Sequence, residues 1–191
     1  MDKRYKMANI KRDKTIKMLN AKIKLLEKEL EHYKMVSYYD VLTKLHNRRI
    51  LEEADGYDYV IMGDIDYFKN INDLYGHDVG DKVLIEIGKT LQTCAQKDSI
   101  ICRWGGEEFL VLLKNCDKYE AKVKAKQIRT SILNLKEKFG FDITMSFGIS
   151  SLKDKELDSA IEEADEAMYE SKNLGRDKIT MYSYSRHLRV E

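Results

Sequence analysis

The segment Arg103–Phe109, RWGGEEF, places two adjacent carboxylates, Glu107 and Glu108, directly after two glycines. The apolar runs SIIC and LVLL flank it, so the pattern predicts a turn between two buried strands. Two unit charges about 4 Å apart in a partly buried site interact at roughly 4 kcal/mol. Carboxylates crowded at the end of a strand therefore indicate a site that binds a cation.

A second acidic segment, DIDYFKNINDLYGHDVGD, follows a mostly apolar run and begins at Asp64. If this run pairs with the hairpin in an antiparallel sheet, Asp64 and Glu107 converge, and Ile65 offers a backbone carbonyl between them. Two or three oxygen ligands with open positions suit Mg²⁺ that bridges substrate phosphates. Zn²⁺ would favour His or Cys ligands.

The same segments contain groups suited to a nucleotide. Gly105 and Gly106 permit a tight turn and let backbone N–H groups approach a phosphate without a Cβ in the way. A carboxylate can accept hydrogen bonds from N1–H and N2–H₂ of guanine, and an amide both donates and accepts. The residues predicted to neutralise a polyphosphate are Lys69, Lys172 and Arg176, and the pair predicted to match guanine is Asn72 and Asp81.

The elements that must position these residues alternate between strands and helices. Apolar periodicity predicts strands in YDYVIMGDID, SIICRW, EFLVLL, FDITMSFGIS and RDKITMY, with helices in GDKVLIEIGKTLQTCAQ, DKYEAKVKAKQIRTSILNLKEKF and DSAIEEADEAMYESKNLG. The order β-α-β-β-α-β with a closing α-β predicts an α+β fold. Its antiparallel sheet would be flanked by helices, in a ferredoxin-like or palm arrangement.

Residues 1–37 differ from the rest because they contain no glycine and read as one helix. Their apolar residues follow the 3-4 spacing of a coiled-coil seam: Ile16, Leu19, Ile23, Leu26, Leu30 and Tyr33. An isolated helix of this length is marginal in water, so we expect a partner helix. A helix folded back onto its own domain is the alternative. The basic flank from Lys3 to Lys17 is read as a solvated face rather than a membrane or nucleic-acid contact.

Composition narrows the function classes. With 191 residues, 43% of them hydrophobic, the chain can bury a core, and 35% charged residues indicate a soluble protein. The 34 basic and 33 acidic residues nearly balance, which gives no signature of nucleic-acid binding. Three cysteines without a CxxC pair indicate reduced thiols in the cytoplasm. We expect no integral membrane segment and no signal peptide.

Five ordered motifs give the chain a resemblance to the GGDEF domain family of diguanylate cyclases. They are DVLTKLHNRR, DIDYFKNINDLYGHDVGD, RWGGEEF, TMSFGIS and ADEAMYESKNLGR. The resemblance covers about residues 38–182 and leaves residues 183–191 as a C-terminal tail. It implies the GGDEF fold and a reaction that condenses two GTP into cyclic di-GMP and pyrophosphate.

The resemblance also implies roles for single residues. Asp64 and Glu107, with the Ile65 carbonyl, resemble the ligands of Mg²⁺ or Mn²⁺, and Glu108 resembles the acid near the ribose 3′-hydroxyl, so these three acids form the expected catalytic set. Asn72 and Asp81 resemble the guanine-binding pair. The group that resembles the family's phosphate-binding residues is Phe68, Lys69, Lys172 and Arg176.

Each domain of the family holds one GTP, so two domains must meet. The resemblance therefore implies a homodimer, for which the N-terminal coiled coil gives a means. A regulatory partner, if there is one, is not identified by the sequence.

The chain departs from the family pattern at two places. Gln96 and Ser99 stand where members with product inhibition carry RxxD, so we expect no intact inhibitory site. Lys44 replaces the usual glycine of the LTGL motif. Two other readings remain open, a GTP-binding regulatory module without turnover and a purely structural coiled-coil partner.

Overall fold

The computed structural model describes residues 3–183, and the chain divides into two compact units, Met1–Tyr39 and Asp40–Glu191. The first unit is the helix α1, Lys3–Tyr38, close to the helix expected from sequence. Apart from Ser183, the expected C-terminal tail lies outside the described residues. None of the helices between residues 3 and 183 is long and apolar enough to cross a membrane.

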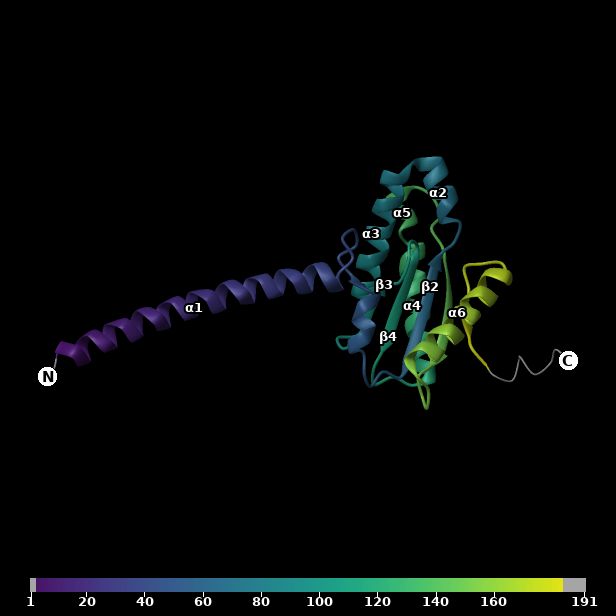
Figure 1. Cartoon of the computed structure of the whole chain (residues 1–191). Coiled ribbons are helices and arrows are strands. Elements are labelled where there is room, and N and C mark those ends of the chain that lie inside the picture. The colour runs from purple at the N-terminus through teal and green to yellow at the C-terminus, as the bar shows by residue number, and fades with distance from the viewer. Residues whose placement is uncertain (1–2, 184–191) are drawn as a thin grey trace. The chain divides into compact units, whose positions relative to one another are not determined.

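The second unit is a six-stranded sheet with helices on both faces (Figure 1). In chain order its elements are β1 His46–Asn47, η1 Arg48–Glu53, β2 Tyr59–Ile65, α2 Phe68–Tyr75, α3 His77–Cys94, β3 Ile100–Arg103, β4 Glu108–Leu113, α4 Lys118–Leu133, α5 Lys136–Phe139, β5 Met145–Ser151, α6 Leu157–Asn173 and β6 Ile179–Met181.

The strand order is β1-β3-β4-β2-β5-β6. The four central strands are antiparallel neighbours, as predicted, and β3 and β4 form the predicted hairpin. The two outer pairs, β1 with β3 and β5 with β6, are parallel, so the sheet is mixed rather than wholly antiparallel. The β5–α6–β6 segment makes the second parallel pair because a helix crosses over between its strands.

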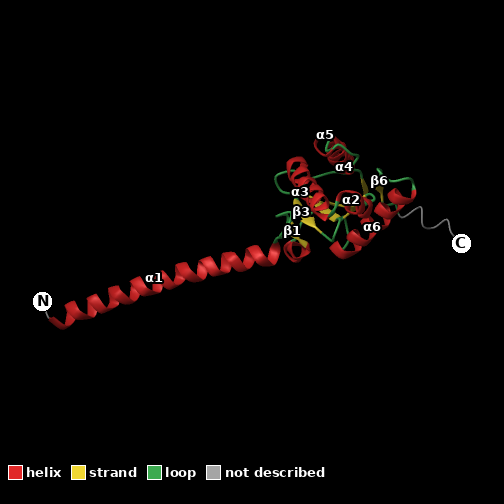
Figure 2. Ribbon diagram, turned by 90° about the horizontal axis from the view of Figure 1, so that it is seen from above, coloured by secondary structure: helices red, strands yellow, loops and turns green. Residues whose placement is uncertain are grey.

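The two faces of the sheet hold two separate apolar clusters. Along β2, Ile61 and Ile65 face α3 and α4, whereas Val60 and Met62 face α6, because successive side chains of a strand alternate between faces. Figure 2 shows α3 and α4 on one side of the strands and α6 on the other. Both faces of the sheet are therefore packed along β2, up to the point where the acidic segment begins.

Candidate active site

The strand register brings the predicted acids to one end of the sheet. Asp64, near the end of β2, is the Cα partner of Glu108, the first residue of β4. Just beyond this pair, the Ile65 backbone N–H donates to the Glu107 carbonyl at 3.3 Å. The two acidic segments predicted to converge are thus joined by the sheet's own pairing.

Helix α6 adds a cation to these acids. Asp64 lies on the face of β2 that carries Met62, and Lys172 lies one helical turn beyond Met168, which packs in the same cluster. The Lys172 Nζ lies 3.0 Å from Asp64 Oδ1, and the Asp64 side chain is only 8% exposed. Lys172 was predicted from the sequence to contact a polyphosphate, and in the structure its ammonium pairs with the Asp64 carboxylate.

Burial, and then neighbouring carboxylates, raise the pKa values of these acids. Burial raises the pKa of Asp64 above 3.8, although the ammonium of Lys172 opposes the shift. Burial and then the charge of Asp64 raise the pKa of Glu107 and of Glu108 above 4.5. This cluster of like charges lowers its own free energy when a cation binds.

The two glycines of the turn act differently from one another. Trp104 and Gly105 donate their backbone N–H groups to the Glu108 carbonyl at 2.9 and 3.3 Å, which closes the hairpin. A Cβ on Gly105 would lie 2.4 Å from Glu108 Oε2, whereas a Cβ on Gly106 would meet nothing within 4 Å. Neither glycine has a positive φ, so the turn does not require glycine for its backbone conformation. Gly105 instead makes room for a carboxylate.

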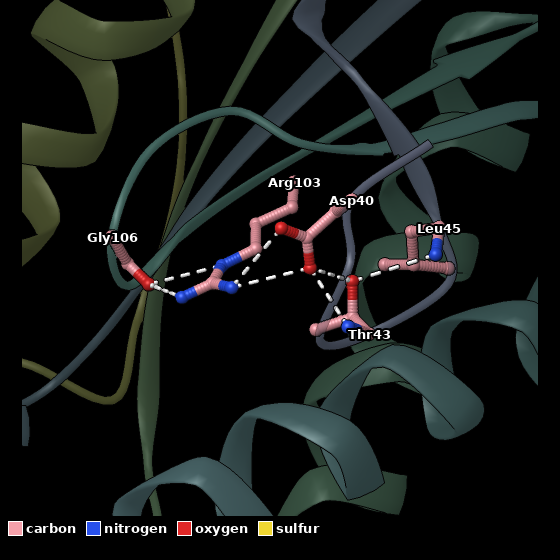
Figure 3. A network of polar contacts seen from close by, with 5 residues as sticks. All are labelled: Asp40, Thr43, Leu45, Arg103 and Gly106. Carbon is pink, nitrogen blue, oxygen red and sulfur yellow. Dashed lines mark hydrogen bonds and ion pairs between the residues drawn. The ribbon is translucent and has the colours of Figure 1, made fainter. Parts of the chain in front are cut away.

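Arg103 fixes the turn to the start of the domain (Figure 3). Its guanidinium donates to the Gly106 carbonyl at 2.6 and 3.2 Å and to the Asp40 carboxylate at 3.1 and 3.3 Å. Asp40 also accepts hydrogen bonds of 2.7 Å from the Thr43 N–H and hydroxyl. Burial tends to raise the pKa of Asp40, but the bonds from Thr43 and Arg103 outweigh it and hold that pKa below 3.8. Both motifs are visible in the sequence, but this link between them was not predicted.

Asp66 has a structural role that sequence analysis also missed. Its carboxylate accepts hydrogen bonds from the hydroxyls of Thr144 and Ser146, both at 2.7 Å, and from the Asp177 N–H at 3.0 Å. Arg129 also binds the Asp177 carboxylate. The loop after α6 is therefore tied to the end of β2, and the Thr and Ser of the TMSFGIS motif were the available signal.

That loop presents Arg176 to Tyr67. The Arg176 guanidinium carbon lies 4.4 Å from the centre of the Tyr67 ring, and Nη1 donates to the Tyr67 hydroxyl at 3.2 Å. Both residues have left-handed backbones, with φ of 61° and 55°, a conformation that costs a side-chain-bearing residue about 1–2 kcal/mol. Strained positions of this kind gather at functional sites when the surrounding structure holds them.

Helices α2 and α3 hold the predicted guanine-binding pair. A Cβ on Gly80 of α3 would lie 1.9 Å from Asn72 Oδ1 of α2, so the absence of a side chain at Gly80 lets the two helices approach closely. Asp81 follows Gly80 and is exposed, and the Asn72 side chain is half-buried at the same junction. Helix α2 itself, which also carries buried Phe68 and exposed Lys69, was not predicted.

Comparison with known proteins shows the family of the chain. The family described as "Diguanylate cyclase, GGDEF domain" matches residues 37–178. The chain belongs to the GGDEF domain family.

Individual GGDEF proteins show how far the similarity extends. Diguanylate cyclase DgcM of Escherichia coli K12 is 38% identical over 168 residues, which cover 82% of this chain and 40% of DgcM. The chain thus spans about two fifths of that relative's length.

Two solved structures are similar over most of the chain. One is the coiled coil and GGDEF domain of DgcB from Caulobacter crescentus, solved in complex with c-di-GMP. Its TM-score is 0.79 at 27% sequence identity, and the match covers 88% of this chain and 98% of the DgcB chain. The other is diguanylate cyclase SiaD from Pseudomonas aeruginosa, solved in complex with its activator SiaC. Its TM-score is 0.72 at 30% sequence identity, and the match covers 93% of this chain and 74% of the SiaD chain.

The acids of this GGDEF domain fit a divalent cation. Carboxylate and carbonyl oxygens are the ligands that Mg²⁺ and Mn²⁺ prefer. Among residues 3–183, no group of three His, Cys, Asp or Glu side chains forms a ready cage for a metal ion.

The place of the family's inhibitory motif is a turn between α3 and β3. Ser99 donates its backbone N–H to the Gln96 carbonyl at 3.1 Å, so the two residues close the turn. Neither Gln96 nor Ser99 carries a charge. The absence of an inhibitory site stays a prediction.

Proposed function

We propose that the chain is a diguanylate cyclase that condenses two GTP into cyclic di-GMP and two molecules of pyrophosphate. The observation that supports this most is the Asp64–Glu108 pairing in the sheet, which gathers the acids of both motifs beside Lys172. A module that had lost turnover would be expected to lose one of these acids, and this chain retains all three.

In this proposal each half-site holds one GTP. Asp64 and Glu107, with the Ile65 carbonyl, hold Mg²⁺ or Mn²⁺, which when bound supplies positive charge to the triphosphate. In this role Glu108 would orient, or accept the proton of, a ribose 3′-hydroxyl, whose oxygen would attack the α-phosphorus of the other GTP in line with the leaving pyrophosphate.

The remaining predicted residues bind the nucleotide. Asn72 and Asp81 hydrogen-bond guanine at the α2–α3 junction, where Gly80 allows the close approach. The phosphate group comprises Phe68, Lys69, Lys172 and Arg176, with the backbone of Gly105 and Gly106 at the turn.

We further propose that two chains act together as a homodimer through α1. The seam residues Ile16, Leu19, Ile23, Leu26, Leu30 and Tyr33 are exposed, and a single helix cannot cover its own seam. Pairing two helices would raise the effective concentration of the half-sites to the millimolar range. The coiled coil in the DgcB structure supports this arrangement.

Regulation and cellular location are also proposals. We propose that a partner protein regulates this chain, and the structure of SiaD in complex with its activator SiaC supports this by similarity. The three cysteines are free thiols, in keeping with the cytoplasm.

The main alternative is a GTP-binding module without turnover. Thermal denaturation with and without GTP and Mg²⁺, run beside product analysis, separates the two. A rise in Tm together with cyclic di-GMP supports the cyclase. A rise in Tm with no product across a range of protein concentrations supports the binding module, and no response to GTP supports a structural role.

A further inference from the structure

The Asp64 carboxylate pairs with the Lys172 ammonium, whose Nζ lies 3.0 Å from Asp64 Oδ1. The carboxylate is almost fully buried, and the lysine side chain is 26% exposed. Removing the partner of a buried charge is costly, so the ammonium stabilises the ionised form of Asp64 when no metal is bound.

The same carboxylate is the proposed metal ligand, so two cations compete for it. A divalent ion and an ammonium within about 3 Å of one carboxylate repel each other strongly in a partly buried site. Binding of the metal alone would therefore displace Lys172 from Asp64 and leave the displaced ammonium without an anion.

A triphosphate supplies that anion. Lysine carries its charge on a flexible four-carbon stem, so the ammonium can leave the carboxylate and reach a neighbouring phosphate oxygen without movement of α6. With a metal held beside Asp64 and the ammonium on a phosphate, Asp64 and Lys172 would each keep a partner of opposite sign.

We propose that Lys172 occupies the cation position of the nucleotide-free site and exchanges Asp64 for a phosphate when a metal–triphosphate binds. This inference rests on the proposed function, and it adds a role for Lys172 before substrate arrives. Lys172 makes binding of the metal alone weak and couples it to binding of the nucleotide. Such coupling is reciprocal and is typically about 5- to 150-fold.

The test is Mn²⁺ binding to the full chain, measured by calorimetry or by the EPR signal of free Mn²⁺. It is repeated with saturating 3′-deoxy-GTP, which has the triphosphate but lacks the attacking hydroxyl. Without nucleotide, Lys172→Met should bind Mn²⁺ about fivefold or more tightly than the parent. With nucleotide, the two affinities should differ by no more than about twofold, so the coupling shrinks.

Lys122→Met is the matched control because it removes the same charge from an exposed position on α4, which packs on the opposite face of the sheet from α6. It should leave nucleotide-free Mn²⁺ affinity near that of the parent. Equal Mn²⁺ affinity of Lys172→Met and the parent, or an equal gain in Lys122→Met, would overturn the exchange.

Asp64→Asn separates this failure from failure of the proposed function. If Asp64→Asn binds Mn²⁺ as well as the parent does, the metal site itself is wrong. If only Asp64→Asn loses Mn²⁺ while Lys172→Met is unchanged, the site stands and the exchange is wrong.

A measurement on the unsubstituted chain covers the case in which Lys172→Met does not fold. Mass spectrometry after brief treatment with an amine-reactive ester reports how accessible Lys172 is. Its labelling should rise when Mn²⁺ is added alone and fall again when 3′-deoxy-GTP is also present. Labelling that does not change with Mn²⁺ would contradict the exchange.

Discussion

Glu107 and Glu108 lie half-buried beside Asp64, and this arrangement opposes folding whenever metal and nucleotide are absent. Because burial and neighbouring charge raise their pKa values in the folded chain, the folded state holds these protons more tightly than the unfolded state does. The stabilisation from this source is fully present below the ordinary pKa of 4.5 and is lost as pH rises through the raised value.

Glu107→Gln should therefore stabilise the nucleotide-free chain at neutral pH while abolishing product formation. We expect Tm to rise by a few degrees at pH 7, since the amide relieves repulsion from Asp64. The gap between variant and parent should close as pH falls toward 4.5, where the parent's carboxyl is protonated. Thermal scans from pH 4 to 8 check this, and a gap that widens toward acid would contradict it.

The two glycines of the turn offer a matched pair of substitutions. In Gly105→Ala the new Cβ displaces the Glu108 carboxylate, which is flexible, so we expect a fall in kcat with stability changed by only about 0.5 kcal/mol. In Gly106→Ala the Cβ points into open space, so stability should again hold, and weaker nucleotide binding should appear as a raised KM.

Steady-state kinetics of both variants measures kcat and KM, and chemical denaturation measures their stability. An unchanged KM in Gly106→Ala would show that no phosphate approaches that backbone. An unchanged kcat in Gly105→Ala would remove Glu108 from the reaction.

At the scale of elements, the turn at Asp40–Leu45 holds the hairpin through Arg103. Lys44 lies in this turn with φ of 61°, a left-handed conformation. Its N–H donates to the Asp40 carbonyl at 3.0 Å, so the turn cannot relax without losing the contacts of Asp40. The structure therefore explains why the family pattern has glycine where this chain has lysine.

Lys44→Gly should stabilise the domain by about 0.5–1 kcal/mol, because relief of about 1–2 kcal/mol of strain exceeds the entropy cost of glycine. Lys44→Ala is the control, since it removes the charge but keeps the Cβ and the strain. Chemical denaturation measures both. Equal effects of the two substitutions would show that charge, and not backbone conformation, matters at this position.

The central elements could be predicted because long apolar runs and the Gly-Gly turn have clear periodicity. Helix α2 could not, since its eight residues form a short amphipathic segment inside an acidic motif. The two-residue strand β1 is too short to leave a pattern, and its parallel pairing with β3 depends on contacts distant in sequence.

The candidate site residues that lie within one recognisable sequence motif could be predicted. The apolar runs beside them mark three acids as lying at strand ends, namely Asp64, Glu107 and Glu108. The Arg103–Asp40 pair and the Asp66 contacts with Thr144 join residues more than 60 positions apart, and only packing shows them. Likewise, the lack of a side chain at Gly105 matters because of one carboxylate, which the sequence cannot show.

At the scale of the whole molecule, the proposal requires two chains. Leu25 and Leu26 lie side by side in α1 and are similarly exposed, at 57% and 52%, but only Leu26 belongs to the seam. Leu26→Glu should therefore disrupt the dimer, and Leu25→Glu should not.

Sedimentation velocity measures the oligomeric state of both variants. At about micromolar protein, Leu26→Glu should also lose product formation by tenfold or more, because the half-sites no longer share a millimolar effective concentration. Raising the protein concentration should restore part of the activity. Identical behaviour of the two variants would contradict a dimer built on this seam.

Isotope mixing tests most directly whether two GTP molecules are joined in one product. The full chain is incubated with Mg²⁺ and an equimolar mixture of unlabelled and ¹⁵N-labelled GTP, beside Glu107→Ala, and the products are separated by mass spectrometry. We expect cyclic di-GMP in which the half-labelled species is the most abundant, with pyrophosphate released and no product from Glu107→Ala. Bound GTP without cyclic di-GMP at any protein concentration, or equal product from Glu107→Ala, would contradict it.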